Sequence, residues 1–451
     1  MSLLTEGASL ADAYLQGRAG RPVNSTRGLD EFERWLGKLD LHAGTDPLRL
    51  ARDTLEWMAS CGVHSDHPRY FGLFNPPALV EGVLGDLIVG VVNPQLAVVE
   101  HAPVAAAIEK RLINEFGALI GWTRTVGHFT SGGSEANHTA LLAALVRRYP
   151  QWAEAGVPRY DRRPGIYASE HAHLAWIKLA RMAGLGADAV RLIPAANDLR
   201  MRAADLRRAL NQEAALDPVL IVGTAGTTAH GAIDDLSELA DVARDVGAHF
   251  HVDAAWAGAG LIVPELISRY AGIDRADSVT IDAHKWLAVP MGAGMYLAQD
   301  EAALARAFAV TTDYMPPSST TLQPYVASIQ WSRRFIGLKL FLALGSRGLD
   351  GYAITIRRQV AMGDMLRAAL VADGWKICNH TWLPLICFCG TSADSQSIAD
   401  DVVQSGEAWI STVALRGRPV LRACITSPDT GESEIERLVT ALSKARERAQ
   451  R

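Results

Sequence analysis

Between about Gly121 and Leu297, short apolar runs alternate with stretches of helical periodicity, and this alternation constrains the fold more than any other feature. Val219–Gly223, for example, is an unbroken apolar run, and Leu236–Val246 further along carries apolar residues at helical spacing. Strands that are buried on both faces give such runs, and helices connect them. The pattern therefore predicts an α/β fold with a mostly parallel sheet flanked by helices.

The segments on either side of this region predict two appendages. Leu29–Trp57 carries apolar residues at helical spacing with a break at Asp46-Pro47, which indicates a helical N-terminal arm. After about Gly363, a helix, two strands and the charged helix Glu432–Arg448 predict a small α+β domain. We therefore expect an arm over residues 1–66, a large domain over 67–345 and a small C-terminal domain over 346–451.

Composition argues against several classes of protein. The chain has 451 residues with 49% hydrophobic and 21% charged side chains, which is ordinary for a globular enzyme, and its net charge of −5 gives no reason to expect nucleic acid or membrane as a partner. The five cysteines lack a Cys-x-x-Cys pair, which argues against a disulfide framework and a zinc site and fits a cytoplasmic protein. We expect no secretory signal in Met1–Gly20 and no membrane span.

Residues that can carry chemistry follow several of the predicted strands. The Ser- and Gly-rich string Phe129–Asn137 precedes a helix, and glycines together with the N–H groups of a helix start can cradle a phosphate. The turn Thr224–Thr228, Asp253 and Lys285 each follow or end a strand. Because ligands of such sheets gather at the carboxyl ends of the strands, we expect one site to collect all four features.

Lys285 is the strongest candidate for a reactive group. A lysine next to a buried strand is costly if it stays charged and unpaired, and an amine in such a place can form a Schiff base. The alternative is a lysine whose stem lies along apolar surface while its amine stays in water. A phosphate cradle, a carboxylate such as Asp253 that can pair with a protonated ring nitrogen, and a lysine amine are together the groups that pyridoxal 5′-phosphate (PLP) needs.

At these residues the chain resembles the group II PLP-dependent amino acid decarboxylases, which include the aromatic-L-amino-acid, glutamate and diaminobutyrate enzymes. The strings His284-Lys285-Trp286 and His251-Val252-Asp253-Ala254-Ala255 carry the resemblance, which extends from about His67 to Arg422. It implies a fold-type I PLP-dependent enzyme that converts an L-amino acid to its amine and carbon dioxide. It also implies a homodimer in which the N-terminal arm packs against the second subunit and the active site lies at the interface.

The resemblance implies roles for individual residues. Lys285 would hold the cofactor as a Schiff base, Asp253 would pair with the pyridine nitrogen, and His173 would stack on the ring. Asp282 departs from the asparagine of the animal aromatic enzymes, and a carboxylate near a phosphate is unfavourable unless a donor intervenes. The other implied cofactor contacts are Gly133, Ser134, Thr228, Ala255 and His284.

Substrate residues are implied in the same way. Phe71, Leu73 and Phe74 match the segment that lines the side-chain pocket of the family, which favours an aromatic or apolar L-amino acid. Asn75-Pro76-Pro77 departs from the aromatic enzymes there. Arg422 matches an arginine near the substrate carboxylate.

A tyrosine is expected to return a proton to the product. The segment Thr311–Gln330 is rich in Pro, Ser and Thr and predicts a long loop. Aromatic members of the family carry a tyrosine on such a loop that reaches across the dimer, and Tyr325 is the best match. Tyr314, His173 and water remain alternatives.

Three other interpretations stay open. The same cofactor could serve an aminotransferase or an aldehyde synthase. His249, His251 and Asp253 alternate along one strand and share a face, so they could bind a divalent metal in a hydrolase, although we expect no metal. The chain could also be a catalytically inactive homologue.

Overall fold

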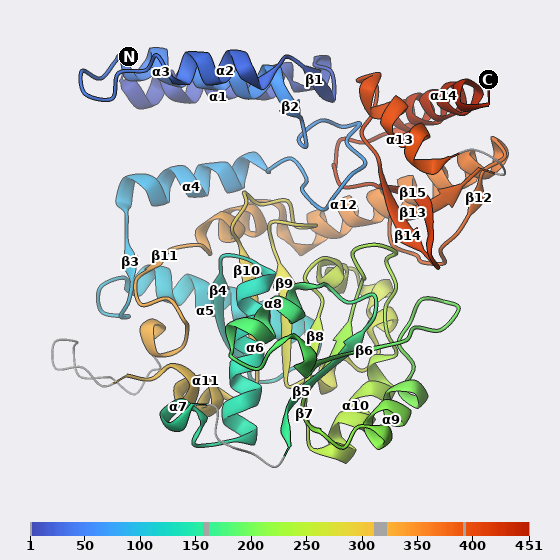
Figure 1. Ribbon diagram of the computed structural model, residues 1–451. Helices are drawn as coiled ribbons and strands as arrows, with labels where there is room; N and C mark the ends of the chain where they lie inside the picture. Colours follow the sequence, from blue (N-terminus) through green and yellow to red (C-terminus); the bar gives the residue numbers. More distant parts are fainter. Residues whose placement is uncertain (1, 157–161, 311–322, 391–393, 451) are drawn as a thin grey trace. The chain divides into compact units, whose positions relative to one another are not determined.

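The computed structural model describes residues 2–156, 162–310, 323–390 and 394–450 (Figure 1). The chain divides into two compact units. The first unit comprises residues 1–77, 358–378 and 384–451, and the second comprises residues 78–357 and 379–383. No helix among the described residues is long and apolar enough to cross a lipid bilayer.

The second unit is built on a seven-stranded sheet. Only β10 runs antiparallel to its neighbours, so the structure confirms the mostly parallel sheet. Every residue of β7, β8 and β9 is buried. In β7 this burial explains the apolar run Val219–Gly223 of the sequence. In spatial order the strands are β4 (Val126–Thr130), β10 (Gly294–Ala298), β9 (Ser278–Asp282), β8 (His249–Asp253), β7 (Leu216–Thr224), β5 (Arg163–Ser169) and β6 (Val190–Ile193).

Helices surround this sheet, and α6 lies across its central strands, in contact with β10, β9, β8 and β7 (Figure 1). Local sequence sets the helix ends: Asp235 caps the start of α10 by accepting from the Glu238 N–H, and Gly247 ends it with a φ of 67° that favours glycine. The helices are α4 (Val80–Val92), α5 (Pro103–Ile120), α6 (Gly133–Arg148), α7 (Trp152–Ala155), α8 (Ala175–Met182), α9 (Ala203–Gln212), α10 (Leu236–Val246), α11 (Glu301–Phe308) and the first part of α12 (Leu338–Ala372).

Two short elements frame the end of the predicted loop. β11 (Arg333–Arg334) pairs with β3 (Gln95–Leu96), and Pro324–Val326 form a single 3₁₀ turn. The rest of the predicted loop, residues 311–322, lies outside the described residues.

The first unit combines helices with a four-stranded antiparallel sheet in the order β12-β13-β15-β14. The break at Asp46-Pro47 starts a helix: the Asp46 carboxylate accepts from the Arg49 N–H, and Pro47 takes the first helical position. The elements are α1 (Leu3–Gly17), β1 (Asn24–Thr26), α2 (Leu29–Leu36), α3 (Pro47–Ser60), β2 (Cys61–Val63), β12 (Lys376–Ile377), β13 (Leu385–Cys389), α13 (Ser395–Gln404), β14 (Ser411–Leu415), β15 (Arg418–Cys424), α14 (Glu432–Ala449) and the end of α12.

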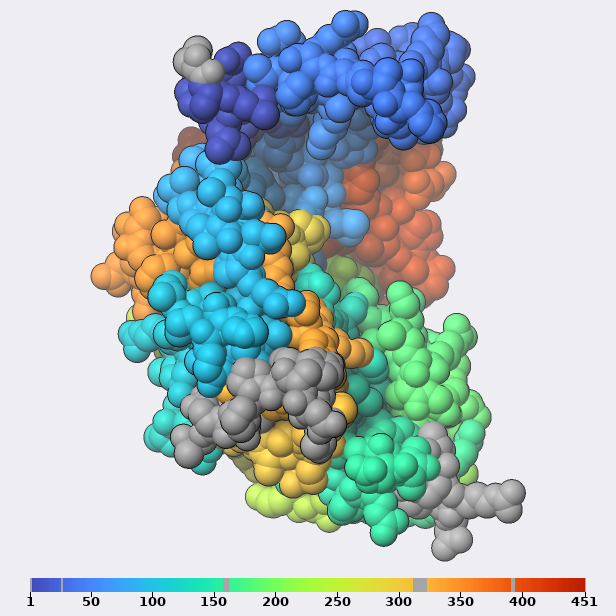
Figure 2. Space-filling view, turned by 90° about the vertical axis from the view of Figure 1, so that its left-hand side faces the viewer, coloured from blue at the N-terminus to red at the C-terminus, as the bar shows by residue number. Residues whose placement is uncertain are grey.

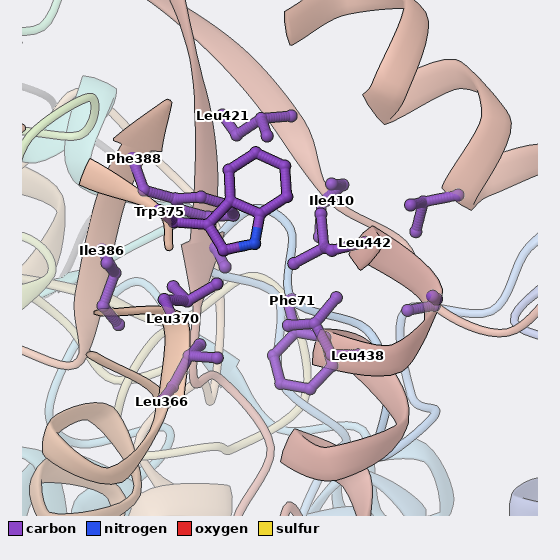
Figure 3. Close-up of a cluster of buried hydrophobic side chains, with 14 of the residues drawn as sticks. Phe71, Leu366, Leu370, Trp375, Ile386, Phe388, Ile410, Leu421, Leu438 and Leu442 are labelled. Carbon is purple, nitrogen blue, oxygen red and sulfur yellow. The ribbon is translucent and has the colours of Figure 1, made fainter. Parts of the chain in front are cut away.

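The core of the first unit lies between this sheet and its helices (Figure 3). Trp375 and Phe388 meet edge to face at 5.5 Å, and Leu438 of α14 and Leu366 of α12 pack into the same cluster. Phe71 is fully buried there. The segment before α4 that carries Phe71 is therefore held by the core of this unit.

Candidate cofactor site

A cavity of about 320 Å³ opens where the strands of the large sheet end. This volume lies in the range of small-molecule sites, about 300–1,000 Å³. Its walls come from the ends of β4, β5, β7, β8 and β9 and from the first turn of α6. The lining residues are Ser131, Gly132, Gly133, Ser134, Glu135, Asn137, His173, Thr224, Gly226, Thr228, Asp253, Ala255, Trp256, Asp282, His284 and Lys285.

The structure brings together all nine residues that the sequence analysis assigned to the cofactor. They are Gly133, Ser134, His173, Thr228, Asp253, Ala255, Asp282, His284 and Lys285.

The start of α6 forms one wall of the cavity, and it must be built from glycine. A Cβ on Gly133 would lie 2.8 Å from the Asp282 Oδ2 and 3.3 Å from the Ala255 Cβ, so a side chain there would force both neighbours to move. The first-turn N–H groups of Gly133 and Ser134 have no acceptor within the helix and sit at its positive end. This geometry suits an anionic group such as a phosphate.

Lys285 is paired at the floor of the cavity. Its Nζ lies 2.9 Å from the Asp282 Oδ2, and Asp282 is only 2% exposed. The Asp282 Oδ1 is buried and has no hydrogen-bond partner among the described residues. The Asp282 Oδ1 is therefore an unused hydrogen-bond acceptor next to the Lys285 amine and Gly133.

His284 presents a hydrogen-bond donor to the same region. Its Nδ1 accepts from the Ala293 N–H at 3.1 Å, and burial lowers the pKa of the ring. A neutral ring with an acceptor Nδ1 carries its proton on Nε2, which lies 3.9 Å from the Asp282 Oδ2. His284 can therefore donate to an anion near Asp282.

Asp253 is a buried carboxylate with both oxygens engaged. Its Oδ1 accepts from the Ala255 N–H at 3.1 Å, and its Oδ2 accepts from the Asn137 Nδ2 at 2.9 Å. Both interactions need a carboxylate that accepts, and they fix its orientation.

His173 is exposed at the cavity. Its Nδ1 accepts from the Ala175 N–H at 3.1 Å, which fixes the ring at the start of α8 and leaves Nε2 for a ligand.

The structure does not gather every predicted residue at this cavity. Tyr325 is half-buried, is absent from the lining, and contacts the Trp331 ring at a centroid distance of 5.1 Å. Tyr314 lies outside the described residues.

Four predicted substrate residues belong to the first unit. Phe71 is a core side chain, and Leu73 is 53% exposed. Arg422 is fully buried, donates to the Gly72 carbonyl at 2.8 Å, and lies over the Phe74 ring at 5.1 Å. Their roles in substrate binding stay predictions.

Several lining residues were not assigned a role from the sequence. Thr224 is buried, and its Oγ1 has no hydrogen-bond partner among the described residues. Asn137 lies one helical turn after Ser134 on the same face of α6, a spacing that could have identified it. Thr224 ends β7 as Asp253 ends β8, which is why the sequence placed the turn Thr224–Thr228 at the site, although it gave Thr224 no role of its own.

The histidines that could have bound a metal ion contact other side chains instead. His249 Nε2 and His251 Nδ1 both contact the Ser278 Oγ, at 2.7 and 2.8 Å. Within the described ranges, no three His, Cys, Asp or Glu side chains are placed to hold a metal ion.

The donor set of the cavity fits PLP. Lys285 supplies an amine, Asp253 a buried carboxylate for a ring nitrogen, and the glycine wall of α6 a phosphate cradle. Among the described residues the Thr224 hydroxyl and the Asp282 Oδ1 are buried without a hydrogen-bond partner, and both residues line the cavity.

Comparison with known proteins agrees with this chemistry. A family model described as the pyridoxal-dependent decarboxylase conserved domain matches residues 38–390. An aromatic-L-amino-acid decarboxylase of Bacillus atrophaeus is 25% identical over 433 residues, covering 92% of this chain and 88% of that protein. An L-2,4-diaminobutyrate decarboxylase of Rhizobium meliloti (strain 1021) is 30% identical over 394 residues, covering 84% of this chain and 78% of that protein.

Solved structures match the fold over nearly the whole chain. The crystal structure of mouse CSAD in apo form gives a TM-score of 0.90 at 26% identity and covers 98% of each chain. The Oryza sativa TDC structure with PLP and tryptamine gives 0.91 at 22% identity, covering 99% of this chain and 97% of that one. These matches confirm the predicted fold-type I architecture.

Proposed function

This chain belongs to the pyridoxal-dependent decarboxylase family, and from that premise we propose residue roles, a substrate class and an assembly for this PLP-dependent amino acid decarboxylase. Bound PLP supplies an electron sink for the electrons left at Cα when carbon dioxide departs. The observation that carries the proposal is the convergence of Lys285, Asp253 and the α6 glycine wall on one cavity.

Each of these groups has a separate task. The Lys285 amine would condense with the carbonyl carbon of the cofactor with loss of water, and Asp282, 2.9 Å from that amine, would hold it in place. The Asp253 carboxylate accepts from the protonated ring nitrogen and so keeps the ring cationic. Gly133 and Ser134 donate to the phosphate, with His284 Nε2 as a further donor, and His173 covers one face of the ring.

For the substrate we propose an aromatic or apolar L-amino acid. Relatives named for aromatic substrates support this choice, among them the Bacillus atrophaeus enzyme and a tryptophan decarboxylase of Camptotheca acuminata that is 27% identical over 384 residues. Arg422, held over the Phe74 ring, is our candidate for binding the substrate carboxylate, because a guanidinium matches a carboxylate in two-point geometry.

A polar amino acid is the second candidate. The Rhizobium meliloti relative, named for L-2,4-diaminobutyrate, is 30% identical, and an aspartate 1-decarboxylase of Aliivibrio fischeri is 35% identical over 272 residues, 54% of this chain. Asn75 follows Phe74 and donates to the Ser65 Oγ at 3.0 Å, so this segment also carries polar groups.

A screen of the common L-amino acids tests both candidates. The holoenzyme is incubated with each, and amine and carbon dioxide are measured together with keto acid, aldehyde and ammonia. Our proposal expects equal amounts of amine and carbon dioxide, with the highest kcat/KM for an aromatic or apolar substrate. Keto acid would identify an aminotransferase, and aldehyde with ammonia an aldehyde synthase. A clear preference for diaminobutyrate or aspartate would reject the substrate class alone.

We further propose a homodimer with Tyr325 serving the neighbouring subunit. The outward face of α4 supports a protein partner. Gly82 and Gly85 of this helix face Pro290 and Lys339 of the same unit, and the opposite side of the helix is apolar and exposed. Figure 2 shows α4, in light blue, at the surface. Patches of this kind mark interfaces. The face consists of Val80, Val83, Leu84, Leu87, Ile88, Val91 and Val92, each between 38% and 67% exposed.

Mixed dimers test this assembly. Lys285→Ala and Tyr325→Phe subunits are inactive or slow alone, but a mixed dimer has one site with both native residues if Tyr325 acts across the interface. Random mixing should then recover about a quarter of wild-type activity. No recovery from a mixture shown to contain mixed dimers would reject the shared site. A monomer by light scattering would reject the dimer.

We also propose a cytoplasmic location. No disulfide joins any of the five cysteines, all of which lie in the described part of the chain, and Cys387 and Cys424 are buried. Reduced thiols are usual in the cytoplasm and unusual in oxidising compartments. Fractionation of cells that express the tagged protein tests this.

A further inference from the structure

We propose that His251 is a positioning residue for the cofactor, which acts through Asn137 on the Asp253 carboxylate without touching the cavity itself. The inference rests on the proposed role of Asp253 as partner of the ring nitrogen. It gives a function to the alternating His249, His251 and Asp253 of β8, which the proposed mechanism otherwise uses only in part.

A continuous chain of short contacts connects these residues. His249 Nε2 lies 2.7 Å from the Ser278 Oγ on β9, and the same oxygen lies 2.8 Å from His251 Nδ1. His251 Nε2 lies 3.0 Å from the Asn137 Oδ1 on α6, and the Asn137 Nδ2 lies 2.9 Å from the Asp253 Oδ2. Of these residues only Asn137 and Asp253 line the cavity.

The chemistry of the end groups fixes the direction of this chain. The Asp253 carboxylate only accepts, so Asn137 must turn its Nδ2 toward Asp253 and its Oδ1 toward His251. The Asn137 Oδ1 also accepts from the Thr280 Oγ1 at 2.7 Å, which agrees with this orientation. His251 therefore donates from Nε2.

The remaining links follow from the charge of the rings. Burial lowers the pKa of His251 to about 3 and that of His249 to about 4, so both rings are neutral at physiological pH. With its proton on Nε2, His251 accepts at Nδ1 from the Ser278 hydroxyl, and Ser278 in turn accepts from His249 Nε2. Every donor thus points toward Asp253.

Such a series of hydrogen bonds, with every donor pointing the same way, has two effects on the Asp253 carboxylate. Each link polarises the next, so the Asn137 N–H is a stronger donor to Asp253 than an isolated amide. The chain also fixes the rotation of the Asn137 amide, because a rotated amide would set its oxygen against the carboxylate. His251 itself is held by the Trp176 ring, which meets it edge to face at 5.6 Å.

A second buried histidine of the same sheet provides a matched control. His128 lies on β4, is 4% exposed, and has no hydrogen-bond partner at either ring nitrogen among the described residues. It does not line the cavity. Both replacements remove a buried imidazole from the large sheet, but only the replacement of His251 breaks the series of hydrogen bonds to Asp253.

The test uses apo-protein titrated with PLP, with quenching of tryptophan fluorescence as the readout, because Trp256 lines the cavity. His251→Leu should raise the PLP dissociation constant about tenfold, since a hydrogen bond to a charged acceptor weakens. His251→Gln keeps a donor toward Asn137 and should stay within about threefold of wild type. His128→Leu should bind PLP like wild type. The visible absorption band of holo His251→Leu should also change its pH dependence.

The outcomes separate this inference from the proposed function. If Asp253→Asn weakens PLP binding but His251→Leu behaves like His128→Leu, the inference is wrong and the role of Asp253 stands. If Asp253→Asn binds PLP normally, both fail. If His251→Leu does not fold, Ser278→Ala decides the matter, because it removes the donor to His251 Nδ1 without adding bulk. PLP binding unchanged in Ser278→Ala would overturn the inference.

Discussion

Replacement of Arg333 by methionine should destabilise the second unit far more than the same change at Arg334. The two residues are adjacent on β11, and each forms one ion pair within the described part of the chain. The Arg333 Nη1 lies 2.6 Å from the Glu109 Oε2, with side chains 4% and 5% exposed. The Arg334 Nη2 lies 3.1 Å from the Asp86 Oδ1, with side chains 56% and 28% exposed.

The expected difference follows from burial. Loss of one partner of a buried ion pair costs about 3–5 kcal/mol, because the other charge is left uncompensated. The Glu109 Oε1 still accepts from the N–H groups of Ile336 and Gly337, at 3.1 and 3.0 Å, so we expect the lower end of that range, about 3 kcal/mol. An exposed pair contributes only about 0–1 kcal/mol.

Urea unfolding of the two variants measures the difference. The free energy of unfolding should fall by about 3 kcal/mol per molar urea, so Arg333→Met should lower the urea concentration at the unfolding midpoint by about 1 M. Arg334→Met should lower it by less than a third of that. Equal shifts in the two variants would refute the reasoning from burial. Since Arg333 and Glu109 fix the chain just after Tyr325, we also expect Arg333→Met to lower kcat more than it weakens PLP binding.

Three further predictions concern the site and its supports. Gly133→Ala should raise the PLP dissociation constant at least about tenfold, because its Cβ would lie 2.8 Å from the Asp282 Oδ2. Gly345→Ala, with open space around its Cβ, should bind PLP normally. Equal binding by the two variants would contradict the need for glycine at the start of α6. Tyr325→Phe should lower amine formation about 100-fold and leave PLP binding unchanged, and an unchanged amine yield would reject Tyr325 as the proton donor. Burial raises the pKa of Asp234 from 3.8 to about 6. The protonated carboxyl group therefore stabilises the folded state at low pH, and this contribution is lost as pH rises through about 6. The shift corresponds to at most about 3 kcal/mol, and the melting temperature of wild type relative to Asp234→Asn should therefore fall between pH 4.5 and pH 7.5; a constant difference would show that Asp234 does not titrate there.

The strand and helix pattern of the large sheet could be predicted because burial on both faces leaves a direct trace in the sequence. β7 and α10 are examples, each visible as an apolar run or an apolar face. Asp253 and Lys285 could be identified for a related reason: parallel strands bring the residues at their carboxyl ends together whatever their separation along the chain.

The remaining features depend on packing between distant segments. The contact of Asn137 with Asp253 requires α6 to lie across β8, and the Arg333–Glu109 pair joins residues 224 positions apart. The burial of Phe71 depends on the sheet and helices of the first unit, which lie far along the chain. No local pattern encodes such distances, so these features emerged only in the folded chain.

The position of the covalent link to the cofactor shows whether Lys285 is the residue that forms the Schiff base. The holoenzyme is reduced with borohydride, digested, and the peptide that carries the cofactor is identified by mass spectrometry. We expect the label on Lys285 and no label in Lys285→Ala. A label on another lysine, such as the buried Lys339 that pairs with Asp86, would contradict this expectation.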